Sequence, residues 1–168
     1  NGRTLTGIFQ TWKSDFIAQL YFQDEIPESK EFLNFFRIRD IDILKKILYK
    51  KTTGGVIRAQ ERVTDHLQYK SKKYKAIVNF LKKFDKLKIL AREFLYKNNK
   101  WQSTELDLWI SKFKPDAIFL LPSIYTFTVD IALEISKKFS LPLYVYFTDD
   151  FLENDNINLG KNYKAKIM

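Results

Sequence analysis

The sequence predicts an α/β fold in which helices pack against a mostly parallel sheet. Near the carboxyl end, a proline precedes an apolar run twice, at residues 117–121 and 143–147. The two runs are separated by about twenty residues with helical periodicity, a length that suits a right-handed crossover between parallel strands. The chain has 168 residues, 45% hydrophobic and 16% aromatic. This is enough for one domain with a buried core.

The first fifty residues predict a helix, two short strands and a second helix. The first helix has Asn1 or Thr4 as its N-cap and an apolar stripe formed by Leu5, Ile8, Phe9 and Trp12. Apolar residues 16–22 and 35–38 predict the strands. Asp40 or Asp42 then caps a helix that ends near Tyr49 and turns three side chains inward, Ile41, Leu44 and Leu48.

Most of the remaining chain, outside the strands already named, is predicted to be helical. Residues 51–75, with Gly54 and Gly55 in a turn, predict a loop and then an exposed, partly helical segment. Residues 76–97 predict a long amphipathic helix with Arg92 and Glu93 on its polar face. Its apolar face consists of Ile77, Phe80, Leu81, Phe84, Leu87, Ala91, Phe94 and Leu95. Ser103 or Thr104 caps the next helix, whose first turn holds Glu105 and Asp107 and whose apolar side is Leu106, Trp109, Ile110 and Phe113. A last helix covers about residues 125–138.

Parallel sheets usually hold their ligands at the carboxyl ends of the strands. The residues that follow Phe22, Ile38, Leu121 and Phe147 are therefore the first candidates for a site. The segment from Asn1 to Thr4 resembles a loop between a strand and a helix, although no strand precedes it. With no initiator Met and no apolar signal core, this start predicts a fragment that lacks its first strand.

The composition excludes several classes of protein. There is no cysteine and one histidine, His66, so thiolate zinc sites, iron–sulfur clusters, Cys nucleophiles and multi-histidine metal centres are ruled out. No metal site is expected. A cysteine-free chain without an apolar run of about twenty residues predicts a cytoplasmic protein that does not span a bilayer.

The net charge of +9 is concentrated in the middle of the chain. Residues 1–40 carry −1, residues 41–100 carry +12 and residues 101–168 carry −2. Residues 51–100 thus predict a basic, mainly helical segment, whose candidate surface for a membrane or an acidic ligand is Lys72, Lys73, Lys75, Lys82, Lys83 and Lys86. Lysine interleaved with aromatic residues also suits nucleic acid, and an ordinary solvated face remains the simplest alternative.

Two groups of residues are candidates for chemistry. Asp149 and Asp150 follow the last predicted strand, where a carboxylate can accept hydrogen bonds from sugar hydroxyls or act as a base; a capped turn is the alternative. The expected substrate-binding residues lie at predicted helix starts and are Gly2, Arg3, Thr4, Ser123 and Tyr125. Capping alone would account for Ser123.

Several stretches resemble the N-terminal, acceptor-side domain of bacterial glycosyltransferases of the GT-B fold, of the polysaccharide-biosynthesis type. They are Gly2-Arg3-Thr4-Leu5-Thr6-Gly7-Ile8-Phe9 with Trp12, Ile17-Ala18-Gln19-Leu20-Tyr21-Phe22, Phe36-Arg37-Ile38, Phe113-Lys114-Pro115-Asp116-Ala117-Ile118 and residues 142–151. The resemblance implies a single Rossmann-like, three-layer domain over residues 1–168 that forms half of a GT-B enzyme. The chain lacks a histidine after Phe147, where relatives often have one.

The resemblance also implies a function. The full-length protein would be an enzyme that moves a sugar from a nucleotide-sugar donor to a glycan or lipid-linked acceptor. In that family the donor binds mainly to a C-terminal domain, so this domain would need no cofactor, would bind the acceptor and would be inactive alone. By analogy Gly2, Asp149 and Asp150 would face the cleft between the domains. A lipid-linked acceptor would place the protein at the inner face of the membrane.

Two other classes of protein share parts of this sequence pattern. Residues 114–120 look like the strand that leads to the phospho-acceptor aspartate of a response-regulator receiver, but the acceptor position is Leu121. A basic nucleic-acid-binding or non-catalytic α/β interaction module is the remaining alternative, and nucleic acid is the least favoured partner.

Overall fold

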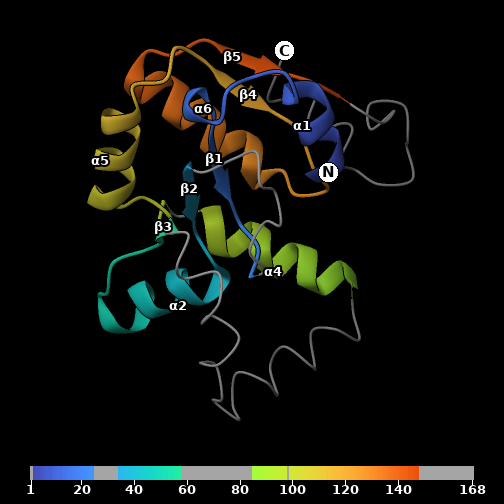
Figure 1. Cartoon of the computed structure of the whole chain (residues 1–168). Helices are drawn as coiled ribbons and strands as arrows, with labels where there is room; N and C mark the ends of the chain where they lie inside the picture. The colour runs from blue at the N-terminus through green and yellow to red at the C-terminus, as the bar shows by residue number, and fades with distance from the viewer. Residues whose placement is uncertain (1, 25–33, 58–84, 98, 148–168) are drawn as a thin grey trace. The chain divides into compact units, whose positions relative to one another are not determined.

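The computed structural model describes residues 2–24, 34–57, 85–97 and 99–147 (Figure 1). By their internal packing, residues 1–113 and 114–168 form two compact units. The first unit contains a three-stranded sheet in the order β1-β2-β3, and the second a two-stranded sheet, β4-β5. The described part of the chain is therefore mixed α/β, as the sequence predicts, with two small sheets.

Helix α1, Gly2–Phe9, begins directly after Asn1, the first of the two predicted N-cap positions. Gly2, Arg3 and Thr4, expected in a loop, form its first turn, so Thr4 is not the N-cap. The helix ends earlier than predicted. The backbone N–H of Trp12 donates to the carbonyl of Phe9 at 2.9 Å, which turns the chain and leaves Trp12 exposed beyond the helix.

Strand β2, Asn34–Arg37, is the centre of the first sheet. It pairs in parallel with β1, Ala18–Tyr21, and antiparallel with β3, Gly55–Ile57. Because Phe35 and Phe36 point to opposite faces and both are fully buried, both faces of the sheet are covered. Both predicted strands are confirmed in part, whereas Phe16 lies in a short 3₁₀ turn, Ser14–Phe16, and is exposed.

Strand β3 was predicted as loop. Val56 and Ile57 favour a strand, but two such residues after a pair of glycines are too short a run to mark one, so pairing with β2 decides their conformation. Ile57, directly opposite Phe35, joins Tyr21 in a core cluster against which Phe9 and Ile17 pack.

Helices α2, Asp40–Tyr49, and α4, Asp85–Lys97, contact each other but differ from prediction in the faces that they bury. In α2, Ile43 is fully buried, whereas Leu48 is exposed. In α4, Phe94 is exposed and Tyr96 is buried. Polar partners for Arg92 and Tyr96, described below, turn this side of α4 inward. The part of the predicted helix at residues 76–84 lies outside the described residues.

Helix α5, Thr104–Phe113, agrees with the prediction. The Oγ of Ser103 accepts a hydrogen bond from the N–H of Leu106 at 3.2 Å, the N-cap contact expected there. Leu106 and Ile110 are buried. The ring of Trp109 lies 5.4 Å from that of Phe36, centroid to centroid, which joins α5 to the core around β2.

The second unit is the predicted βαβ unit. Strands β4, Ile118–Leu120, and β5, Leu143–Val145, are parallel and are connected by α6, Phe127–Phe139. Helix α6 contacts both strands and buries Phe127, Val129, Ile131, Ala132 and Ile135. None of the helices in the described ranges is long and apolar enough to cross a membrane.

Candidate functional site

The carboxyl ends of β1 and β2 lie side by side because the two strands are parallel and in register, with Tyr21 opposite Arg37. The N–H of Ile38 donates to the carbonyl of Tyr21 at 3.0 Å, which extends the pairing past the strands. The residues that leave the sheet here are those after Phe22 and Ile38. Two of the four positions chosen from the sequence are therefore neighbours in space.

Arg39 and Asp42 hold the start of α2. The Oδ2 of Asp42 accepts from the backbone N–H of Arg39 at 3.1 Å and from its Nε at 3.0 Å, while Oδ1 accepts from Nη2 at 3.0 Å. The guanidinium and carboxylate thus meet in a two-pronged pair, and both side chains are mostly buried. Arg39 is the N-cap, and Asp42 reaches back to it from the first turn. The predicted N-cap, Asp40 or Asp42, is therefore wrong, although Asp42 takes part in the cap from the first turn of the helix.

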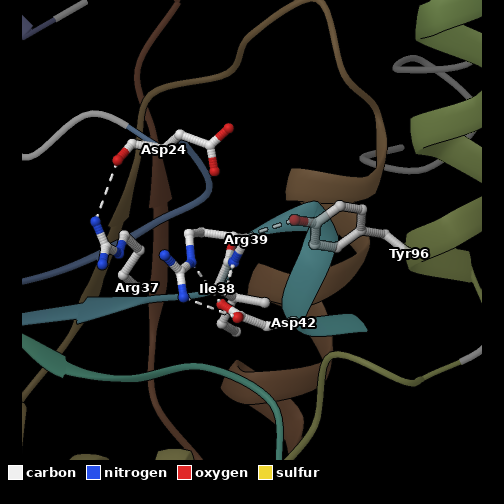
Figure 2. A network of polar contacts seen from close by, with 6 residues as sticks. All are labelled: Asp24, Arg37, Ile38, Arg39, Asp42 and Tyr96. Atoms are coloured by element: carbon white, nitrogen blue, oxygen red, sulfur yellow. Dashed lines mark hydrogen bonds and ion pairs between the residues drawn. The ribbon is translucent and has the colours of Figure 1, made fainter. Parts of the chain in front are cut away.

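Asp40 binds two residues of α4. Its carboxylate accepts from Arg92 Nε, with Oδ1 at 3.1 Å and Oδ2 at 3.0 Å, and the Tyr96 hydroxyl lies 3.0 Å from Oδ1. The same hydroxyl is 3.2 Å from the Ile38 carbonyl, the contact drawn in Figure 2. Arg92 Nη2 also donates to the carbonyl of Phe22 at 2.6 Å. One helix therefore fastens the ends of both parallel strands.

The hydroxyl of Tyr96 is held in its neutral form. Burial and then the Asp40 carboxylate raise its pKa well above the ordinary value of 10.0. The Arg92 guanidinium lies 5.8 Å from the centroid of the Tyr96 ring, and the Phe22 ring meets that ring edge-on with centroids 5.6 Å apart. Tyr96 is accordingly a neutral hydrogen-bond donor that joins α4 to the residues after β2.

Asp24 differs from the other two carboxylates. Its carbonyl oxygen accepts from Arg37 Nη1 at 3.1 Å, and Figure 2 shows its carboxylate turned away from that contact. The carboxylate accepts no hydrogen bond from the described residues. Partial desolvation, and next the Asp40 carboxylate, raise the pKa of Asp24 above 3.8; Arg39 and Arg37 oppose this. An open carboxylate of raised pKa can accept a hydrogen bond from a ligand hydroxyl or take its proton.

The other predicted site residues lie elsewhere. Thr4 is half-buried in α1. In the second unit the Oγ of Ser123 accepts from the N–H of Tyr125 at 3.2 Å, and the Tyr125 ring packs at 5.5 Å from that of Phe127, centroid to centroid. The first contact fits the local capping role considered for Ser123. Of the predicted substrate-binding residues, Ser123 and Tyr125 therefore contact each other.

Most of the remaining predicted site residues lie outside the described residues: Asp149, Asp150, Lys72, Lys73, Lys75, Lys82 and Lys83. Lys86 lies in the first turn of α4. Within the described ranges, no group of three or more histidine, aspartate or glutamate side chains is arranged to hold a metal ion.

Sequence reasoning missed the contributions of Arg92 and Tyr96. Their spacing of four residues, which puts both on one helical face, was the available signal. Arg92 was instead assigned to the polar, solvent-facing side. Comparison with protein-family models, curated proteins and solved structures finds no match to this chain.

Proposed function

We propose that this chain is the acceptor-binding part of a glycosyltransferase that uses a nucleotide-sugar donor, and that its α/β architecture is a Rossmann-like half of a GT-B enzyme. The observation that carries the proposal is the Asp24 carboxylate, open to a ligand at the carboxyl edge of two parallel strands. The sequence resemblance supports the same class. Carboxylates that accept hydrogen bonds are suited to the hydroxyl groups of a sugar.

The geometry suggests a role for each charged residue. The Arg39–Asp42 and Arg92–Asp40 pairs are committed to each other and hold the strand ends in place. Arg37 holds the backbone at Asp24, so it positions the carboxylate without neutralising it by direct contact. Asp24 is then the residue of this edge that is available to an acceptor.

In the proposed reaction an acceptor hydroxyl donates its hydrogen bond to Asp24. The oxygen of the acceptor hydroxyl attacks the anomeric carbon of the donor sugar. The bond from that carbon to the nucleotide phosphate breaks, and the phosphate leaves with the electron pair. The hydroxyl proton passes to the Asp24 carboxylate. A raised pKa makes this carboxylate a stronger base than an ordinary aspartate.

The parts of the proposal that concern other regions rest on the resemblance. The donor would bind mainly to a further, C-terminal domain. Asp149 and Asp150 remain candidates for a catalytic role, and Gly2, Arg3, Thr4, Ser123 and Tyr125 remain predicted acceptor contacts. The acceptor would be a glycan or a lipid-linked glycan. The enzyme would be cytoplasmic, on the inner face of the membrane.

The test is sugar transfer by the full-length gene product. The assay supplies a panel of radiolabelled nucleotide sugars with glycan and lipid-linked acceptors, and it compares wild type with Asp24→Asn. Removal of a general base lowers such rates by about 10²-fold or more. Asp116→Asn, an exposed aspartate in the second unit, is the matched control and should retain full activity.

Two results would contradict the proposal. Absence of transfer and of nucleotide-sugar hydrolysis with every donor would remove the enzyme class. Full activity of Asp24→Asn in an active enzyme would remove Asp24 from the reaction and leave Asp149 or Asp150 as the residue to replace next.

A further inference from the structure

Three consecutive apolar side chains at the carboxyl end of α2 are exposed. Ile47 is 49% exposed, Leu48 68% and Tyr49 69%. Scattered exposed apolar residues are ordinary on a protein surface, but three in succession concentrate apolar surface at one helix end. Residues 47–49 are called the α2 tip below.

The way α2 ends keeps the tip in place. Lys50 adopts a left-handed conformation with φ 54°, and its N–H donates to the carbonyl of Lys46 at 3.0 Å. The helix therefore stops immediately after Tyr49, and its last turn projects three successive side chains in different directions. Ile43, one turn earlier, is fully buried and anchors the helix. The tip is thus held on a rigid element.

Lysines flank the α2 tip on both sides in the sequence, and there is no acidic residue within the run 45–51, Lys-Lys-Ile-Leu-Tyr-Lys-Lys. Lys50 and Lys51 are exposed, and Lys45 is half-buried. Lys46 has a structural role, because its Nζ donates to the carbonyl of Gln102. Burial and then the nearby Lys100 lower the pKa of Lys46. Glu105 opposes this shift, so the second segment near Lys46 carries charges of both signs.

Apolar tips within a basic rim match one kind of partner best. Ile and Leu cannot stack on bases as aromatic rings do, so nucleic acid leaves the most apolar part of the tip without a partner. An anionic lipid surface accepts both parts: aliphatic side chains enter the acyl boundary, tyrosine lies at the headgroup level and lysines contact the phosphates. The charge and the chemistry of the tip are complementary to that surface.

We infer that the α2 tip inserts Ile47, Leu48 and Tyr49 into the surface of an anionic membrane while Lys50 and Lys51 bind its headgroups. This inference does not depend on the proposed transfer reaction. It also uses other residues than the six lysines of the surface predicted from the sequence, of which Lys86 lies in α4 and the other five lie outside the described residues.

The first experiment measures co-flotation of the full chain with vesicles. Vesicles of phosphatidylcholine alone are compared with vesicles that also contain phosphatidylserine. Wild type should prefer the anionic vesicles. Leu48→Ser with Tyr49→Ser should lower the partition coefficient about tenfold or more, since two large apolar contacts with the bilayer are lost. Lys50→Gln with Lys51→Gln should lower it about tenfold at low salt.

A second, equally exposed apolar pair supplies the matched control. Leu90 and Phe94 lie four residues apart on α4 and are 64% and 71% exposed. Leu90→Ser with Phe94→Ser removes as much exposed apolar surface but should leave the partition unchanged. Equal loss in this control would overturn the assignment to the α2 tip, as would equal binding of wild type to both kinds of vesicle.

A second measurement reports insertion directly. Because the chain has no cysteine, Leu48→Cys can be labelled at one position with an environment-sensitive fluorophore. Anionic vesicles should shift its emission to the blue, while the label at Leu90→Cys should not respond. Unchanged emission at both positions would contradict insertion, even if the protein floats. Salt-sensitive binding to a single-stranded oligonucleotide that shifts the Leu48→Cys label, with no response to vesicles, would assign the tip to nucleic acid instead.

Discussion

Gly54 occupies a position that no other residue can fill without strain. Its φ is +77°, and a Cβ built there would lie 2.7 Å from the carbonyl oxygen of Arg37 and 2.7 Å from the Phe36 ring. The close approach lets the chain turn into β3 against the end of β2. The sequence indicated only a turn at this glycine pair, because contact with a strand seventeen residues earlier leaves no local signal.

Gly54→Ala should destabilise the protein by roughly 2–5 kcal/mol, the sum of a left-handed alanine and an overpacked core. Gly55→Ala is the matched control, since no heavy atom lies within 4 Å of its added Cβ. Urea unfolding followed by circular dichroism measures both. Equal effects of the two substitutions would show that the close approach at Gly54 does not exist in solution.

Tyr96→Phe tests the fastening of α4 to the candidate site. The substitution keeps the buried ring and removes the hydroxyl that binds Asp40 and Ile38. Loss of a hydrogen bond to a charged group should cost about 1.5–3 kcal/mol in the free energy of unfolding. Tyr144→Phe, at an exposed position of β5, should change it by less than about 0.5 kcal/mol. A neutral effect at Tyr96 would mean that Asp40 is held without it.

Asp24→Asn should change stability with a distinctive pH dependence. Because the pKa of Asp24 is raised above 3.8 in the folded protein, its charged form is less favourable in the folded than in the unfolded chain. The substitution should therefore stabilise the protein at neutral pH. This gain should vanish as the pH falls below 3.8, where the carboxyl group is protonated in both states.

Urea unfolding at several pH values measures this effect, with Asp116→Asn as the control for loss of one charge. Destabilisation by Asp24→Asn at neutral pH would show that the carboxylate has a favourable partner. A stabilising effect joined to lost transfer activity would instead identify a carboxylate that is kept for function at a cost in stability.

At the scale of elements, local signals decided how well each segment was predicted. Helix α5 has its N-cap serine and acidic first turn, and β4 and β5 follow prolines as apolar runs; these predictions are confirmed. The faces of α2 and α4 were wrong in part because periodicity counts apolar residues only. Arg92 and Tyr96 are buried through polar contacts that sequence hydrophobicity cannot show.

The same reasoning explains how far the candidate site could be predicted. The rule for parallel sheets selected the positions after Phe22 and Ile38, and these are the ends where Asp24, Arg39 and Asp40 lie. It could not say which aspartate is open and which are paired. That distinction depends on α4, because Arg92, which pairs with Asp40, lies 52 residues further along the chain.

Ser140→Gly should strengthen the end of α6. Ser140 is the C-cap, with φ 54° and ψ 43°, a left-handed conformation that glycine adopts without a Cβ penalty. The gain should be about 0.5–1 kcal/mol. Ser111→Gly, an exposed position inside α5, should have the opposite sign because glycine weakens a helix interior. Thermal melting of both variants measures the contrast, and destabilisation by Ser140→Gly would show that its side chain has a role.

For the whole molecule, the sequence predicted one mostly parallel sheet, and the described strands form two. The parallel pairs β1-β2 and β4-β5 follow from the predicted segments. Which strands are neighbours across the chain is a non-local property that periodicity does not contain, and β3 adds an antiparallel edge that no pattern indicated. The class of fold was therefore predictable, and the pairing of strands was not.

The two compact units should differ in their ability to fold alone. The described part of the second unit has two strands of three residues each and one helix. Sheets of two strands are marginal in water, and so small a core does not offset the loss of chain entropy. The first unit has a three-stranded sheet whose central strand carries the fully buried Phe35 and Phe36. A fragment of residues 114–168 should therefore show no cooperative urea transition, whereas residues 1–113 should unfold cooperatively.

Circular dichroism and ¹H–¹⁵N correlation spectra of the two fragments, with the full chain as the reference, decide the matter. Dispersed amide resonances and a cooperative transition in residues 114–168 alone would contradict the expectation and make the βαβ unit an independent domain. Collapse of residues 1–113 alone would instead show that the mixed sheet depends on the second unit. If the prediction holds, Ser140→Gly should raise the stability of the full chain without rescuing the isolated fragment, because about 1 kcal/mol is too little to create a missing core.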